Sequence, residues 1–280
     1  MAALNTYSSI STLVNTVWAD AMFVAREQGP MVGLVTTMGD IRGMAVRKNT
    51  KYGTATINQV DESDDLTSQA LTPSTDQTLT PYEYGAQFFL TDQRLDSDIY
   101  NLRGDAATEL GGAYGDKVDG YLSGLFSSLT GGTVGGTTTD FTWANFFGAI
   151  TKARIAKIPR PWVMVLQPSQ WHALATAVAP GVTVTNSPMI QDEVLRSFYV
   201  NTVAGIDVFV DGNIATAATV YGGLFHRSAI ALDMRRAPRI EVERDASRRG
   251  YELNWSSVFA YGVWRPSRGI CIDTAGTTPV

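Results

Sequence analysis

Residues 91–129 read TDQRLDSDIYNLRGDAATELGGAYGDKVDGYLSGLFSSL. Apolar and aromatic side chains recur through this stretch at steps of three and four residues: Ala107, Leu110, Tyr114, Val118, Tyr121 and Leu125. With 3.6 residues per turn, these positions share one side of a helix. The spacing therefore predicts one long helix whose apolar stripe faces the core.

Glycine interrupts the same segment, at Gly104, Gly111, Gly112, Gly115, Gly120 and Gly124. Each glycine costs about 1 kcal/mol relative to alanine inside a helix. We therefore expect tertiary packing to hold the helix, with the glycines permitting close backbone approach or a bend. A long helix in an ordinary bundle is the alternative interpretation.

The preceding segment, residues 39–90, has a β pattern. We expect strands at 41–48, 52–60 and 77–90, and in the last of them alternate residues from Tyr82 to Leu90 share one face. Between the strands, residues 61–75 are rich in Asp, Ser and Thr. So polar a stretch buries too little apolar surface to order itself, which predicts a protruding tip that contacts a partner.

The segments before the β-patterned region and after the long helix have simpler patterns. Residues 10–24 repeat apolar side chains at helical spacing until Gly29-Pro30, which predicts a short amphipathic arm, and residues 31–38 look extended. Residues 131–136, GGTVGG, predict a flexible joint after the long helix.

The second half of the chain alternates helical and strand patterns before turning mainly to β structure, as in an α/β unit followed by strands. The expected elements are a helix capped by Asp140 and ending near Lys157, a strand at 162–166, helices starting at Pro168 and at 190–199, a strand at 206–210, and mostly strands over 220–272 with a long one at 251–264.

Composition indicates a globular chain. The 280 residues are 44% hydrophobic and 18% charged, enough to bury a large core. No run approaches the roughly 18 apolar residues of a membrane span, and we expect neither a signal peptide nor a membrane partner. Cys271 is the only cysteine, so we expect a small buried hydrophobe rather than a disulfide or a cysteine-based metal cluster.

Charge is uneven along the chain. The net charge of -5 argues against a dedicated nucleic-acid reader. Residues 226–268 nevertheless hold nine arginines and five acids, or +4, which leaves -9 for the rest. The candidate contact residues here are Arg235, Arg236, Arg248 and Arg249. These arginines have two interpretations: a subunit contact or DNA-facing surface, or a solvated strand face whose arginines pair with local acids.

The predicted tip, residues 61–75, carries a second set of charged residues. Its acids are Asp61, Glu62, Asp64 and Asp65. They begin like a calcium loop, but Leu66 replaces the turning glycine and Thr72 replaces the bidentate glutamate. A solvated loop is one interpretation, and ion pairing to Lys48 or Lys51 of a neighbouring chain is the functional one.

Catalytic motifs are sparse. His172 and His226 are the only histidines, no G-x-S-x-G occurs, and residues 131–136 lack the lysine of a phosphate loop. We expect no catalytic residue, no metal and no cofactor.

The order of these parts resembles the major capsid proteins of tailed bacteriophages, the Hong Kong 97 fold. The segments that carry the likeness are FFLTDQRLDSD (88–98), GGAYGDKVDGYL (111–122), WVMVLQPSQWHAL (162–174), GIDVFVDGNI (205–214) and GLFHRSAIAL (223–232).

That resemblance implies an α+β fold divided along the chain. The expected parts are an N-terminal arm (1–38), an extended loop (39–90), a spine helix and the start of the peripheral domain (91–139), a mainly α/β apical domain (140–222), and return strands with the peripheral domain and C-terminus (223–280). In such a fold the spine bends as the shell expands, and we expect Gly111, Gly112 and Gly115 to ease that bending.

The resemblance also implies partners. The subunit would form pentamers and hexamers of itself, close an icosahedral shell in the host cytoplasm, join a portal protein and contact packaged double-stranded DNA without sequence preference. The chain begins almost at the arm, so we expect a separate scaffolding protein or none, and a decoration protein is a further candidate. The alternatives are an encapsulin nanocompartment, or, in another class, an α/β hydrolase using His172 or His226.

Overall fold

The computed structural model describes residues 29–62, 65, 68–97, 102–178 and 202–276. They divide into two compact units. One unit contains residues 84–117 and 238–257, and the other contains residues 29–83, 118–237 and 258–276. The predicted arm helix at 10–24 and the predicted helix at 190–199 lie outside the described residues.

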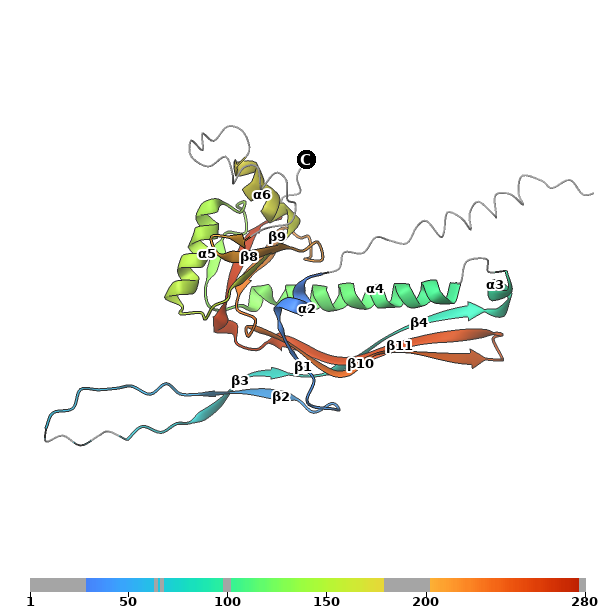
Figure 1. The fold of residues 1–280 in the computed structure, drawn as a ribbon, viewed down its shortest axis with the longest axis horizontal. Helices are drawn as coiled ribbons and strands as arrows, with labels where there is room; N and C mark the ends of the chain where they lie inside the picture. Colours follow the sequence, from blue (N-terminus) through green and yellow to red (C-terminus); the bar gives the residue numbers. More distant parts are fainter. Residues whose placement is uncertain (1–28, 63–64, 66–67, 98–101, 179–201, 277–280) are drawn as a thin grey trace, which may run out of the picture. The chain divides into compact units, whose positions relative to one another are not determined.

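The larger unit is built on a six-stranded mixed sheet of order β5-β12-β9-β6-β8-β7. Figure 1 shows helices α5 and α6 beside this sheet. The elements are β5 (Thr133–Gly135), α5 (Trp143–Ile155), β6 (Val163–Leu166), α6 (Pro168–Val178), β7 (Thr202–Val203), β8 (Ile206–Val210), β9 (Thr219–Phe225), η2 (Pro266–Arg268) and β12 (Gly269–Ala275).

One apolar core joins these helices to the strands. It includes Phe146 and Ala149 of α5, Leu174 of α6, Met164 of β6 and Leu224 of β9, each fully buried. The predicted α/β alternation is therefore confirmed for the described elements. The α5 cap differs from the prediction, because Thr142 rather than Asp140 accepts the Asn145 backbone N–H, at 3.3 Å.

The predicted flexible joint at 131–136 is wrong, because it contains strand β5. This strand pairs in parallel with β12, and the Cys271 backbone N–H donates to the Gly132 carbonyl at 2.8 Å. Gly135 has φ +107, and a Cβ there would lie 2.0 Å from the Asp273 carbonyl oxygen. Here glycine serves tight strand packing instead of mobility.

A second sheet has the strand order β1-β10-β11-β4. Its strands are β1 (Thr36–Met38), β4 (Tyr82–Thr91), β10 (Ile230–Asp245) and β11 (Gly250–Val263). The prediction that 31–38 is extended is wrong in its first half, where α2 (Met31–Leu34) follows Pro30. The predicted strand at 77–90 is two strands, β3 (Pro73–Leu79) and β4, separated at Thr80 and Pro81.

β2 (Arg47–Tyr52) and β3 form a separate antiparallel two-stranded sheet, seen in Figure 1 as a narrow ribbon. Its register pairs Arg47 with Leu79 and Tyr52 with Pro73. The predicted strand at 52–60 is wrong beyond Tyr52, since no regular strand continues there. We call residues 53–72, the segment beyond the paired strands, the distal ribbon.

The prediction of one long helix over 91–129 is wrong, because the described residues of this range form three elements. They are α3 (Asp92–Asp96), α4 (Leu102–Ser123) and the 3-10 helix η1 (Gly124–Ser128). Of the predicted stripe, Leu110 and Val118 are buried, while Tyr114 and Tyr121 are half-buried. In the smaller unit, Leu110 packs with Leu90, Leu253 and Trp255, and the Tyr114 and Trp255 ring centroids lie 4.9 Å apart.

Candidate subunit-contact surfaces

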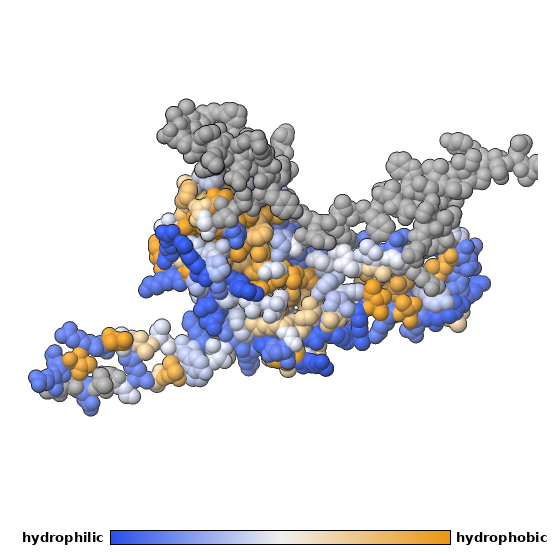
Figure 2. All heavy atoms as spheres, viewed as in Figure 1, coloured by the Kyte–Doolittle hydropathy of each residue, from blue (hydrophilic) through white to orange (hydrophobic). Residues whose placement is uncertain are grey.

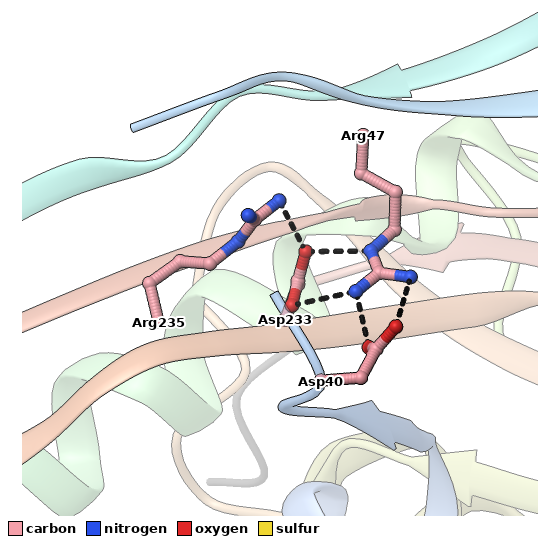
Figure 3. A network of polar contacts seen from close by, with 4 residues as sticks. All are labelled: Asp40, Arg47, Asp233 and Arg235. Atoms are coloured by element: carbon pink, nitrogen blue, oxygen red, sulfur yellow. Dashed lines mark hydrogen bonds and ion pairs between the residues drawn. The ribbon is translucent and has the colours of Figure 1, made fainter. Parts of the chain in front are cut away.

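The base of the ribbon is fastened to its own chain by four charged residues (Figure 3). Arg47, at the start of β2, places Nε 2.8 Å from Asp233 Oδ2 on β10, and its Nη2 pairs with Asp40. Arg235 Nη2 lies 2.7 Å from the same Asp233 oxygen. Two guanidinium groups and two carboxylates therefore meet, and their formal charges cancel.

Burial makes this network costly to disturb. The side chains of Asp233 and Arg235 have no exposed surface, and Arg47 is 14% exposed. Hydrogen bonds to Asp233 and Asp40 raise the pKa of Arg47, and the bond from Arg47 lowers the pKa of Asp40. Arg47 and Asp40 therefore stay charged at neutral pH, and the bond from Arg47 to Asp233 keeps the ribbon base tied to β10.

Further contacts fix the same base. Asn49 is 6% exposed, and its Nδ2 donates to the Trp264 carbonyl at 2.6 Å. Leu79, opposite Arg47 in the ribbon, is fully buried against Ala231 and Ala260. The base of the ribbon is therefore held in place by contacts within its own chain.

The distal ribbon has the opposite character. Ile57 is 98% exposed and Leu71 66% exposed. Thr56 on one limb and Gln69 on the other exchange hydrogen bonds between backbone and side-chain amide, at 2.8 and 2.5 Å. Figure 2 shows apolar residues scattered among polar ones along this segment. A segment so poorly buried has little in its own chain to hold it in one conformation.

The charged ribbon residues chosen from sequence are accessible wherever they are described. Lys48 and Lys51 on β2 are exposed, as are Asp61, Glu62 and Asp65. Asp64 lies outside the described residues. Pairing of these acids to lysines of a neighbouring chain stays a prediction.

The arginine-rich segment is neutralised largely within its own chain. In the larger unit, Arg235 is buried against Asp233, and Arg236 pairs with Glu83. We therefore interpret Arg235 as an internal ion-pair residue rather than a contact with a neighbour, because its guanidinium group is inaccessible.

In the smaller unit, two arginines are similarly engaged. Arg244 Nη2 lies 3.0 Å from Asp92 Oδ2, and Arg248 Nη1 lies 3.4 Å from Glu252 Oε1. Arg248 also lies over the Phe89 ring, 4.4 Å from its centroid. Arg249 is exposed and has a left-handed backbone, φ 52, at the end of the β10–β11 turn. Subunit contacts at Arg248 and Arg249 stay predictions.

The spine glycines have room around them. A Cβ at Gly111 or Gly115 would meet no atom within 4 Å, so these two positions do not serve close packing within the chain. Both are exposed on α4, and Gly112 is half-buried. Their role in bending stays a prediction.

Asp119 on α4 is a buried carboxylate that the sequence pattern does not single out. Asp119 is 1% exposed, and it accepts hydrogen bonds from the Met31 backbone N–H at 2.9 Å and from Asn213 Nδ2 at 3.2 Å. A Cβ at Gly29 would lie 1.8 Å from Asp119 Cγ. Asp119 therefore holds the start of α2 against α4. Its position next to the buried stripe residue Val118 was the available signal.

Replacing Asp119 with alanine leaves the Met31 N–H and the Asn213 amide without this acceptor. We expect the free energy of unfolding to fall by about 2 kcal/mol, the usual cost of unsatisfied buried donors. Denaturant unfolding of the unassembled subunit measures it. Asp116→Ala, one turn away on the same helix, is the control, and equal effects from both variants would refute the assigned role.

The remaining candidate groups show little reactive geometry. His226 Nδ1 lies 2.7 Å from Ser228 Oγ, and burial lowers the pKa of His226. His172 is exposed on α6. Cys271 is buried on β12, as predicted, and burial raises its pKa to about 11. Within the described ranges, no three His, Cys, Asp or Glu side chains gather as metal ligands, and no helix is long and apolar enough to span a membrane.

Comparison with solved structures identifies the fold class. A chain from Mycobacterium phage Che8 is 15% identical with a TM-score of 0.73, covering 90% of this chain and 94% of that one. The capsid of the cyanophage P-SCSP1u is 15% identical with a TM-score of 0.71, covering 91% of each chain. The capsid of the native GTA particle is 14% identical with a TM-score of 0.68, covering 90% and 92%. The α+β fold is the Hong Kong 97-like fold of tailed-phage capsids, as predicted.

The sequence itself gives the family. Residues 75–272 match the profile described as phage capsid protein, over well more than half of the chain. The chain therefore belongs to the phage capsid protein family. It is a major capsid protein that self-assembles into a shell of capsomers in the virion. No curated protein sequence matches the chain. Neither the nanocompartment nor the hydrolase alternative is favoured.

Proposed function

We propose that this subunit assembles through pentamers and hexamers into an icosahedral shell that encloses the double-stranded DNA genome of a tailed phage. The supporting observation is the contrast along the ribbon. Its base is locked by the buried Asp233 network, whereas its distal half exposes Ile57 and Leu71 to solvent. A fixed base with an unburied end suits a segment completed by a second chain. One similar structure, the native GTA capsid, was computed with C5 symmetry.

The proposal includes further partners and a place of assembly. The shell joins a portal protein, assembles in the host cytoplasm with a separate scaffolding protein or none, and can accept a decoration protein. Packaged DNA is held by non-specific contact, since a chain of net charge -5 lacks the basic surplus of a dedicated reader. The role is structural, with no reaction catalysed by His172 or His226.

Electron microscopy of the purified recombinant chain tests this proposal. We expect closed spherical particles or capsomer rings with fivefold and sixfold symmetry. A chain that stays monomeric under all assembly conditions, with or without a scaffolding protein, would contradict it.

The proposed bending of α4 predicts a mutational phenotype. Replacing Gly111, Gly112 and Gly115 with alanine should stabilise the helix, by about 1 kcal/mol at each of Gly111 and Gly115, where a methyl group would enter open space. A stiffer helix should then block particle expansion. Particle diameter before and after an expansion trigger measures this. Gly124→Ala, equally open but outside α4, is the control, and triple-variant particles that expand normally would refute the bending role.

A further inference from the structure

Most arginines of residues 226–268 are neutralised within the chain, but three that lie in one region are not. Five of them pair with an acid of the same chain: Arg235, Arg236, Arg239, Arg244 and Arg248. Arg227, Arg265 and Arg268 of the larger unit have no ion-pair partner among the described residues. They belong to two turns, residues 226–229 and 264–268, which contain one histidine and no acid. We call His226, Arg227, Arg265 and Arg268 the basic cluster.

Backbone hydrogen bonds hold the two turns of the basic cluster against each other. The His226 N–H donates to the Arg268 carbonyl at 3.1 Å, and the Arg265 N–H donates to the Ala229 carbonyl at 3.0 Å. The Arg227 carbonyl accepts from Thr36 Oγ1 at 2.9 Å. The fold therefore fixes the backbone positions from which the three arginine side chains start.

Hydrogen bonds also decide which ring nitrogen of His226 carries the proton. The Ser228 backbone N–H, which can only donate, lies 3.2 Å from His226 Nδ1. Nδ1 is therefore an acceptor, and the proton of the neutral ring is on Nε2. Arg268 Nη1 donates to Ser228 Oγ at 2.9 Å, and the Ser228 hydroxyl lies 2.7 Å from Nδ1. Ser228 and Arg268 thus orient the ring, and its Nε2–H has no acceptor among the described residues.

The cations of the basic cluster affect one another. Burial and the charges of Arg268 and Arg227 lower the pKa of His226. Burial and the charge of Arg265 lower the pKa of Arg268. No carboxylate of the described residues offsets these repulsions. Three guanidinium charges held near one another oppose the folding of the single chain, and a bound anion would relieve that cost.

We propose that the basic cluster binds a phosphate group, with the three guanidinium groups and the His226 Nε2–H as donors. Guanidinium groups match phosphate oxygens in geometry and remain charged at all physiological pH values. The inference deepens the proposed function, on which it rests for the source of the phosphate. A phosphodiester of packaged DNA and free inorganic phosphate present the same oxyanion chemistry, and titration with each distinguishes them.

Carboxylates of a neighbouring chain are the competing partner. Each carboxylate carries one charge, so several acidic side chains would have to converge on the two turns. Double-stranded DNA instead presents about one negative charge per 1.7 Å of its axis, so one short stretch of backbone can face all three arginines. The phosphate interpretation therefore needs fewer independently placed groups.

Imidazole NMR of the unassembled subunit tests the site, because His226 and His172 are the only histidines. Replacing chloride with inorganic phosphate at constant ionic strength should raise the pKa of His226, since a bound anion favours the protonated ring. The resonances of His172, exposed on α6, should not move. The variant Arg227→Gln with Arg265→Gln should lose most of the response. These two side chains make no hydrogen bond or ion pair within the described residues, so the variant should stay folded.

Arg249→Gln is the matched control for this double variant. Arg249 is also exposed and has no ion-pair partner among the described residues, but it lies in the smaller unit. Its replacement should leave the response of His226 to phosphate unchanged.

Titration with a short DNA duplex identifies the source of the phosphate. A duplex that saturates the His226 response at lower concentration than inorganic phosphate identifies DNA as the ligand. In that case the slope of log K against log salt should become shallower by about one for each arginine removed from the cluster. A response to inorganic phosphate alone identifies the free ion. Both results support the site.

Three results would overturn the proposal. The first is a folded subunit in which neither phosphate nor duplex changes His226, and the second is a wild-type response in Arg227→Gln with Arg265→Gln. The third is a raised pKa of His226 in empty particles in phosphate-free buffer, measured by hydrogen exchange at the ring C2, which would show carboxylates of a neighbouring chain at the cluster. Absence of particles from the wild-type chain refutes the shell function, whereas particles with an unresponsive His226 refute the phosphate site alone.

Discussion

Replacing Asp233 with asparagine lowers the free energy of unfolding by about 3–5 kcal/mol, the cost of leaving a buried charge without its partner. Asp233 is the carboxylate that Arg47 and Arg235 share, and Arg235 has no exposed side-chain surface. Nε, Nη1 and Nη2 of Arg235 are buried and have no well-aligned hydrogen-bond acceptor among the described residues, so the ion pair with Asp233 is the main compensation for its charge. Guanidinium unfolding of the unassembled subunit measures the change.

The matched control is Asp40→Asn, at the exposed end of the same network, whose side chain is 69% exposed. Solvent screens that pair, so we expect a much smaller effect. The double variant Asp233→Leu with Arg235→Met should recover most of the stability, because apolar residues of similar size replace a buried ion pair well. An Asp233→Asn variant as stable as Asp40→Asn would show that the network does not anchor the ribbon.

Shortening the ribbon should abolish particles and leave the subunit folded. Tyr52 and Pro73 are opposite each other in the ribbon, so an Asn-Gly turn can replace the distal ribbon, residues 53–72, and close the hairpin. The base contacts at Arg47, Asn49 and Leu79 remain. We expect no particles at ten times the concentration at which the wild type assembles, since the surface proposed to reach the neighbour is gone.

Circular dichroism and the melting temperature of the shortened subunit provide the control. Both should match the wild-type subunit, because Ile57 and Leu71 bury little in their own chain. A shortened chain that still closes into shells would show that the distal ribbon is dispensable. A shortened chain that unfolds would place its contacts within the subunit instead.

Sequence patterns located the elements whose burial repeats regularly. Strand β8 at Ile206–Val210 and helix α5 follow directly from apolar periodicity. The patterns gave a wrong prediction where pairing with a distant strand determines the structure. GGTVGG is typical of a flexible joint, but in the fold it pairs with β12. Glycine content indicates only which backbone conformations are permitted. It does not indicate that β12, which is distant in sequence, will pack closely against these glycines.

The exposure of the candidate contact residues was predictable only where it depends on the local sequence. Exposure of Asp61 and Glu62 follows from a polar stretch that cannot form a core. The burial of Arg235 does not follow, because its partner Asp233 and the ribbon residue Arg47 come together only through tertiary structure. The exposed side of α5 was likewise not predictable, since Phe147 and Phe146 are adjacent and only the fold shows which one is buried.

Cryo-electron microscopy of particles assembled from the purified chain tests the central claim most directly. The account predicts closed shells in which the distal ribbon of each subunit lies on a neighbouring copy. A chain that remains a monomer, with residues 53–72 packed against its own larger unit, would contradict it.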